Sequence, residues 1–265
     1  MSLQGVRVTQ TSPVALVTGG ARGIGAAAVA QLRAQRLRVL FTYVPGFDGT
    51  PADDDAHPLD LRDPAGISTL FDAIVARHGG LDVLVNNAAV GSATVAGFSP
   101  DPAQQDALMM QINAVGTLSM CRGFLALRGT GHPGPRKIIN IASVGGGIAA
   151  FPGFALSDGM SKSAVAHLTR QLAAELTGPE VDVFALCPGA TNTAMFRAST
   201  LDPMSPEKRA GFLAALPKGR LIEPVEIATL IGFLAGPHST VLHGAVIDAS
   251  MGLGVRPGLV TEAPH

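Results

Sequence analysis

Runs of consecutive apolar residues recur along the chain, and a stretch with helical periodicity follows most of them. Runs that stay apolar, without alternating, are typical of strands that helices cover on both faces. Right-handed crossovers join such strands into one parallel sheet. The pattern therefore predicts a single-domain α/β protein of the Rossmann type, with a doubly wound, seven-stranded parallel sheet and helices on both faces. The predicted strands are residues 14–18, 38–42, 56–59, 81–86, 137–142, 181–187 and 245–248.

The stretches between the strands carry apolar residues three and four positions apart, which places them on one face of a helix. Residues 45–58 break this rhythm because they are rich in Gly, Pro and Asp, and they predict a loop or a much shortened helix. Residues 190–217 carry Pro203 and Pro206 and predict a flap over a site. No repeat or linker divides residues 1–265, so we expect one domain. The predicted helix faces are Ile24, Ala28 and Leu32; Leu108, Ile112, Val115 and Leu118; and Val165, Leu168, Leu172 and Leu176.

The charge balance argues against some classes of partner. With 19 basic and 20 acidic residues, nothing in the chain favours nucleic acid or an anionic membrane surface. No apolar run approaches the length of a membrane span, and the first residues lack the layout of a signal peptide. Cys121 and Cys187 lie in apolar runs, so each is predicted to be a buried thiol in a reducing compartment. We therefore expect a cytoplasmic protein without a metal site.

A glycine-rich stretch, residues 18–25, stands between the first strand and the first helix. A strand that turns sharply into a helix offers the unpaired N–H groups of that helix to an anion. The glycines permit the tight turn and leave no Cβ between the backbone and a pyrophosphate. A glycine-rich turn without a ligand is the alternative interpretation. The position of the stretch, near the start of an α/β chain, favours dinucleotide binding.

The ordered motifs between residues 14 and 252 resemble those of the short-chain dehydrogenase/reductase family. Residues 18–25 resemble its cofactor loop. Asn113 matches the helix asparagine of its proton relay, Ser143 its catalytic serine and Lys162 its catalytic lysine. The resemblance, together with the glycine loop, implies a cofactor site made of Thr18, Gly19, Arg22, Gly23, Ile24, Gly25, Tyr43, Asp60, Leu61, Asn87, Ala88, Ala89, Lys162, Pro188, Gly189, Thr191 and Thr193.

Several of these residues also have purely structural explanations. Asp60, which the resemblance places at the adenine amino group, could be an ordinary turn acid, and Asn87 could satisfy backbone groups. Asn113 lies in an apolar helix face and needs a polar partner or water. Ser143 closes a strand at the edge where ligands bind in such sheets, which favours a functional role.

The second strand has no acidic residue at its end, where an acid would bind the ribose 2′-hydroxyl of NAD. Arg22 lies inside the glycine loop, where a guanidinium could pair with a 2′-phosphate. These two features favour NADP. NAD remains the alternative, if Arg22 only caps a helix or lies in solvent and Tyr43 stacks on adenine. Asp48 and the acidic run 53–55 would oppose a phosphate if their loop folded back over the site.

The family's catalytic tyrosine is missing. Asp158 stands four residues before Lys162, and the only tyrosine of the chain is Tyr43. The pKa of an aspartate lies near ~3.9, and a neighbouring ammonium would lower it further. Keeping the carboxyl protonated at neutral pH would cost about 4 kcal/mol, so Asp158 is a poor direct replacement. The spacing from Ser143 is also longer than in the family, and residues 145–157 are expected to differ locally.

Three outcomes remain open. Asp158 could act through a water or with a pKa raised by burial, or Ser143 and the cofactor could suffice for a reactive substrate. Alternatively, the protein could be a dinucleotide-binding pseudoenzyme or a non-redox enzyme. Asp158 could also be the N-cap of the helix that carries Lys162, a role compatible with chemistry. We expect an oxidoreductase that transfers a hydride between NADP(H) and a small carbonyl or alcohol, with the catalytic residues Asn113, Ser143, Asp158 and Lys162.

The expected substrate pocket consists of residues 90–98 and 144–154 and the flap. These segments are largely apolar or small, so an uncharged or apolar small molecule is favoured. The resemblance also implies a homodimer or homotetramer that forms through helices at residues 103–127 and 161–177 and the last strand.

Overall fold

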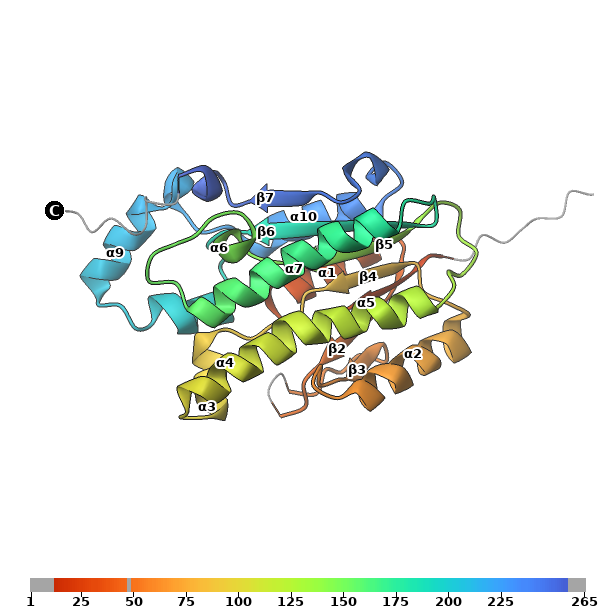
Figure 1. The fold of residues 1–265 in the computed structure, drawn as a ribbon, viewed down its shortest axis with the longest axis horizontal. Helices are drawn as coiled ribbons and strands as arrows, with labels where there is room; N and C mark the ends of the chain where they lie inside the picture. The colour runs from red at the N-terminus through yellow and green to blue at the C-terminus, as the bar shows by residue number, and fades with distance from the viewer. Residues whose placement is uncertain (1–11, 47–48, 257–265) are drawn as a thin grey trace, which may run out of the picture.

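The computed structural model describes residues 12–46 and 49–256 (Figure 1). Seven parallel strands form one sheet in the order β3-β2-β1-β4-β5-β6-β7. This confirms the predicted fold, and each predicted strand boundary lies within two residues of the observed one. The strands are β1 (Val14–Val17), β2 (Arg38–Tyr43), β3 (Ala56–Pro58), β4 (Val83–Asn86), β5 (Arg136–Ile141), β6 (Val181–Pro188) and β7 (Val246–Ala249).

The strands are apolar throughout because helices cover both faces of the sheet. Neighbouring residues of one strand point to opposite faces, and so Leu16 and Val17 of β1 enter different hydrophobic cores. One face is covered by α2 (Pro64–His78), α4 (Pro102–Met110), α5 (Thr117–Ala126) and α7 (Leu156–Glu175), and the other by α1 (Gly23–Ala34) and α10 (Pro224–Ala235) (Figure 1).

The two irregular regions behave differently. Between β2 and β3 the described residues, 44–46 and 49–55, contain no helix, which confirms the predicted loop. The predicted flap is mostly helical. Its elements are α8 (Ala194–Phe196), a π-helix (Arg197–Leu201), α9 (Pro206–Ala215) and a 3-10 turn (Pro217–Gly219). The remaining short elements are α3 (Ser92–Phe98), α6 (Val144–Gly147) and 3-10 turns at Thr240–Leu242 and Leu253–Val255.

One predicted helix face is wrong at Val115, whose side chain is 53% exposed. A π-helix (Gln111–Gly116) separates α4 from α5 and inserts wider turns into the predicted stripe. The apolar spacing of an α-helix no longer holds there, so Ile112 stays buried and Val115 turns outward.

The edge of the sheet where β5 and β6 begin holds a buried ion pair. Lys137 Nζ lies 2.5 Å from Asp182 Oδ2, and both side chains are almost fully buried. The hydroxyl of Thr240 donates to the same carboxylate oxygen at 2.8 Å. The described residues include no helix with both the length and the apolar character needed to span a bilayer.

Candidate active site

The loop between β1 and α1 is built around glycines. Gly19 and Gly23 have positive φ angles of 64° and 54°, which glycine adopts without strain. A Cβ at Gly25 would lie 2.1 Å from the carbonyl oxygen of Gly19 and 2.6 Å from Asn87 Nδ2. The first turn of α1 contains no acidic residue, and no side chain caps its N–H groups. The loop therefore packs directly on the helix end and leaves that end open to an anion.

Thr18 and Asn87 fasten this loop to the end of β4. Thr18 Oγ1 accepts hydrogen bonds from the backbone N–H groups of Asn87 and Ala88, at 3.0 and 2.9 Å. Asn87 Nδ2 in turn donates to the carbonyl oxygens of Thr18 and Gly19, each at 3.0 Å. These bonds fix the glycine loop against the second loop of the site, which is the structural role foreseen for Asn87.

A cavity of about 700 Å³ opens at the edge where the parallel strands end. The structure brings most of the predicted site residues together in its wall. Thr18, Gly25 and Asn113 do not line the cavity, since all three are buried behind it. The predicted residues in the wall are Gly19, Arg22, Gly23, Ile24, Tyr43, Asp60, Leu61, Asn87, Ala88, Ala89, Ser143, Asp158, Lys162, Pro188, Gly189, Thr191 and Thr193.

Asp60 is paired with a residue that the sequence analysis did not single out. The Arg62 guanidinium donates to both of its carboxylate oxygens at 2.5–3.0 Å and lies 5.5 Å from the centre of the Phe98 ring. This pairing lowers the pKa of Asp60. Arg62 and Phe98 both line the cavity. The DLRD motif, with an arginine two residues after the acid, was the only available signal.

The acidic residues of the β2–β3 loop are held away from the cavity. Asp53 pairs with Arg33 and Asp55 with Arg38, both through short contacts of 2.8 and 2.6 Å. Neither carboxylate lines the cavity. Asp53 and Asp55 therefore do not repel a phosphate bound in the cavity. Asp48 lies outside the described residues.

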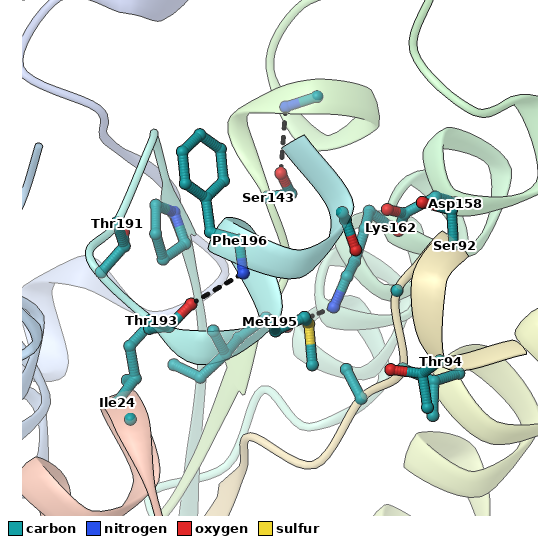
Figure 2. Close-up of a pocket in the computed structure, with 18 of the residues that line it drawn as sticks. Ile24, Ser92, Thr94, Ser143, Asp158, Lys162, Thr191, Thr193, Met195 and Phe196 are labelled. Atoms are coloured by element: carbon teal, nitrogen blue, oxygen red, sulfur yellow. Dashed lines mark hydrogen bonds between the residues drawn. The ribbon is translucent and has the colours of Figure 1, made fainter. Parts of the chain in front are cut away.

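Ser143 lies two residues past the end of β5 and is the N-cap of α6. Its Oγ accepts a hydrogen bond from the N–H of Gly145 at 3.2 Å, so its own hydroxyl hydrogen can still be donated into the cavity. The Phe154 ring covers this segment, because a Cβ at Gly145 would lie only 3.0 Å from it. The segment after Ser143 thus forms part of the pocket wall, as expected (Figure 2).

Asp158 and Lys162 are one turn apart on α7 and both face the cavity. The N-cap interpretation of Asp158 is wrong: Ala155 is the N-cap, and no side chain bonds to the N–H groups at that helix end. Burial raises the pKa of Asp158, and the opposing charge of Lys162 reduces this rise without reversing it. The expected lowering by the lysine is present, but desolvation is the larger effect, so the alternative in which burial raises the pKa of Asp158 is the one that holds.

Lys162 is buried, and its Nζ makes one long hydrogen bond of 3.4 Å to the carbonyl oxygen of Ile141. Burial lowers its pKa, and the neighbouring Asp158 opposes that shift. Figure 2 shows Lys162 and Asp158 together with Ser143, the flap residues and Ile24 around one pocket. Residues from distant parts of the chain thus share this site.

Asn113 lies in the π-helix and is already fully bonded. Its Oδ1 accepts from the N–H of Val90 at 2.8 Å, and its Nδ2 is within 3.2 Å of the carbonyl oxygen of Val90 and of Ser161 Oγ. The hydroxyl of Thr117 donates to its backbone oxygen at 2.7 Å. Asn113 therefore ties the loop after β4 to α7. These bonds supply the polar partners that its side chain was expected to need in apolar surroundings.

The remaining wall of the cavity matches the predicted pocket segments. Residues 90–98, the segment after Ser143 and the flap all contribute, whereas Thr42, Ile112 and Leu253 were not foreseen. The sequence pattern assigns these three residues to a strand, to the buried face of a helix and to the end of the chain. No local sequence feature therefore indicated that they would line the cavity. The aromatic members of the wall are Tyr43, Phe98, Phe151, Phe154, Phe196 and Phe212.

Comparison with known proteins covers nearly the whole chain. Residues 19–254 match the family described as enoyl-(acyl carrier protein) reductase. The chain is 32% identical over 259 residues to the monensin polyketide synthase putative ketoacyl reductase of Streptomyces virginiae, covering 92% of this chain and 98% of that protein. It is 33% identical over 252 residues to a rhamnolipid biosynthesis 3-oxoacyl-(acyl-carrier-protein) reductase of Pseudomonas aeruginosa, covering 90% and 95%.

Solved structures show the same similarity. The Pseudomonas aeruginosa RhlG/NADP active-site complex has a TM-score of 0.78 at 31% identity, with 91% of this chain and 96% of that chain covered. A variant of the actinorhodin polyketide ketoreductase with NADPH also has a TM-score of 0.78, at 30% identity, with 93% and 98% covered.

Proposed function

Because the chain belongs to the short-chain dehydrogenase/reductase family, we propose that it transfers a hydride between NADP(H) and a small carbonyl or alcohol substrate. The observation that carries this proposal is the shared cavity. Ser143, Asp158 and Lys162 line the same hollow as the glycine loop. A bound nicotinamide and a substrate carbonyl therefore have their binding groups in one cavity.

The residues at the glycine loop fit a dinucleotide. A Cβ at Gly19 would lie 3.0 Å from the Cα of Ala88, so only glycine fits here and the loop backbone stays exposed to a ligand. The end of α1 offers N–H groups to the pyrophosphate, and Arg22 lines the cavity beside them, where it would pair with a 2′-phosphate. The relatives whose structures hold NADP or NADPH support this cofactor. In the proposal, Asp60, Leu61 and Tyr43 surround the adenine end.

The nicotinamide, when bound, supplies the hydride. Ser143 donates its hydroxyl hydrogen to the substrate oxygen, since its Oγ is oriented by the N–H of Gly145. Lys162 holds the ribose hydroxyls with the Nζ hydrogens that its bond to Ile141, its one hydrogen bond among the described residues, leaves over. Asn113 supports the proton relay from behind the cavity wall, because its hydrogen bonds to Val90 and Ser161 tie the loop after β4 to α7.

Asp158 replaces the family's tyrosine in this proposal. It stands four residues before Lys162, lines the cavity and has a pKa raised by burial. The raised pKa brings the carboxyl nearer to the range in which it can hold and release a proton at working pH. We therefore favour the interpretation that this site belongs to a reductase in which Asp158 is the proton donor.

The test is the oxidation of NADPH, followed by its absorbance, with a panel of ketones and aldehydes, alongside NADPH binding measured by fluorescence. We expect turnover that Ser143→Ala lowers by roughly 10²-fold or more, with NADPH affinity retained. Tight NADPH binding without turnover of any carbonyl would overturn the redox proposal.

The absence of a second tyrosine favours one other candidate, a dinucleotide-binding protein without redox turnover. Asp158→Tyr separates the two. If the remaining site is competent, the phenol should raise the rate of carbonyl reduction. A rate that stays at zero would point to the altered segment after Ser143 and to a binding role.

We also propose that the chain works as a cytoplasmic homodimer or homotetramer. Val115 is an exposed apolar residue within the stretch 103–127 that is expected to form the contact, and Leu156 and Met160 are exposed on α7 just before the expected stretch 161–177. Burying such side chains between two copies would stabilise the oligomer. Light scattering of the purified protein measures its state directly.

A further inference from the structure

The Asp158 carboxylate is an unusual member of the cavity wall. It is half-buried, and none of the hydrogen bonds or ion pairs within the described part of the chain uses its oxygens. A carboxylate in this position has lost water without gaining donors, which is why burial raises its pKa. A ligand that brings an N–H donor or a positive charge would supply the missing partner.

The cavity that the Asp158 carboxylate faces has several aromatic residues in its wall. Five of the eleven phenylalanines of the chain line the cavity. The rings of Phe196 and Phe212 on the flap are 6.3 Å apart, and the Phe154 ring lies beside Gly159, the neighbour of Asp158. The face of an aromatic ring attracts organic cations, and the attraction is stronger away from water. A cavity whose wall combines a carboxylate with aromatic rings is therefore suited to an organic cation.

Few positive charges oppose such a ligand. The basic residues of the cavity wall are Arg22, Arg62 and Lys162. Arg22 belongs to the glycine loop, and Arg62 is engaged with Asp60. Burial lowers the pKa of Lys162, which weakens its hold on a proton. At the Ser143 end of the cavity, Asp158 is the only acidic residue in the wall, and Lys162 is the only basic one.

We propose that the bond this site reduces best is a protonated carbon–nitrogen double bond, an iminium on an aromatic or bicyclic amine, bound by Asp158 and the phenylalanine walls. This inference rests on the proposed hydride transfer. Reduction of a ketone builds negative charge on oxygen, and Asp158 can neutralise it only when the carboxyl itself carries a proton, because no tyrosine stands there to donate one. An iminium already carries its proton and its charge is opposite to that of the carboxylate.

The reaction balances without a further donor. The hydride from NADPH forms the new C–H bond at the iminium carbon, and the C=N π pair becomes the lone pair of the amine nitrogen. The cofactor is oxidised to NADP⁺ and the substrate is reduced by two electrons. Asp158 keeps the substrate nitrogen protonated before the transfer, so no general acid is needed during it.

Binding of the cation is tested without the cofactor. Tetrahydroisoquinoline is an ammonium at neutral pH, and isochroman is the matched ether without charge. We expect calorimetry to show the ammonium binding at least about tenfold more tightly. Asp158→Asn should abolish this preference, whereas Asp72→Asn, at an exposed carboxylate on α2, should leave it unchanged. Equal affinity of the two probes for the wild-type protein would overturn the cation site.

Turnover is tested with dihydroisoquinoline, a cyclic imine, against the matched ketone α-tetralone, both with NADPH. We expect faster reduction of the imine, and a loss of roughly 10²-fold in Asp158→Asn. Reduction of the ketone but not the imine would overturn this inference and leave the proposed function intact. Reduction of neither, with NADPH bound, would instead overturn the proposed function and with it the reduction of imines.

Discussion

The close packing of the glycine loop gives a prediction whose size follows from the structure. In Gly25→Ala, the added Cβ would lie 2.1 Å from the carbonyl oxygen of Gly19, whereas non-bonded carbon contacts lie at about 3.5–4.0 Å. It would also lie 2.6 Å from Asn87 Nδ2, the atom that holds the loop in place. The loop must therefore move away from α1 by more than an ångström.

Overpacking of this kind typically costs about 1–3 kcal/mol. A protein of this size loses about 2–4 °C of melting temperature per kcal/mol, so we expect a drop of several degrees. The displaced loop also no longer matches the pyrophosphate. NADPH affinity should therefore fall at least about tenfold, which corresponds to roughly 1.4 kcal/mol.

The matched control is Gly211→Ala in α9, where an added Cβ has no described heavy atom within 4 Å. Alanine is favoured over glycine inside a helix by about 0.5–1 kcal/mol, so this variant should be slightly more stable and should bind NADPH as before. Thermal melting and fluorescence titration measure both variants. If Gly25→Ala kept the melting temperature and the NADPH affinity of the wild type, the packing argument would be refuted.

Three further predictions concern buried titratable groups. Asp158→Asn should raise the melting temperature at neutral pH, because a raised pKa means that the ionised carboxyl destabilises the folded state. The gain in melting temperature should vanish as the pH falls towards ~3.9, where the carboxyl is protonated in the unfolded chain as well. A gain that does not depend on pH would contradict this. Lys137→Ala should cost about 3–5 kcal/mol in urea unfolding, since it removes the ammonium from a buried carboxylate and leaves Asp182, among the described residues, only the Thr240 hydroxyl and the His243 ring; a change below ~1 kcal/mol would count against it. Burial raises the pKa of Cys121 to about 12 and of Cys187 to about 11, so neither thiol should react with iodoacetamide at pH 8 until the protein is unfolded; rapid labelling of the native protein would contradict this.

The sequence could predict the sheet because continuous apolar runs have one main explanation, a strand covered on both faces. It could also predict that Ser143 and the glycine loop share a site, since parallel strands end at one edge of the sheet. The structure bears out both points. The positions of the strands and of their ends could thus be predicted from the sequence pattern alone.

The environment of Asp158 could not be predicted from the sequence pattern in the same way. Its position on α7, two residues past the first helical residue, depends on how the segment after Ser143 packs. Its pKa depends on whether desolvation outweighs the charge of Lys162, and this balance is set by the folded surroundings. The pairing of Asp60 with Arg62, and the π-helix that turns Val115 outward, likewise result from tertiary packing.

The central claim is that this cavity carries out hydride transfer although it lacks the family's tyrosine. The most direct measurement uses NADPH labelled with deuterium at the transferring position of the nicotinamide, with mass spectrometry of the product. We predict a reduced product that carries one deuterium on the former carbonyl or iminium carbon, and that forms far more slowly in Ser143→Ala. Absence of any deuterated product, with labelled NADPH bound to the protein, would contradict the claim.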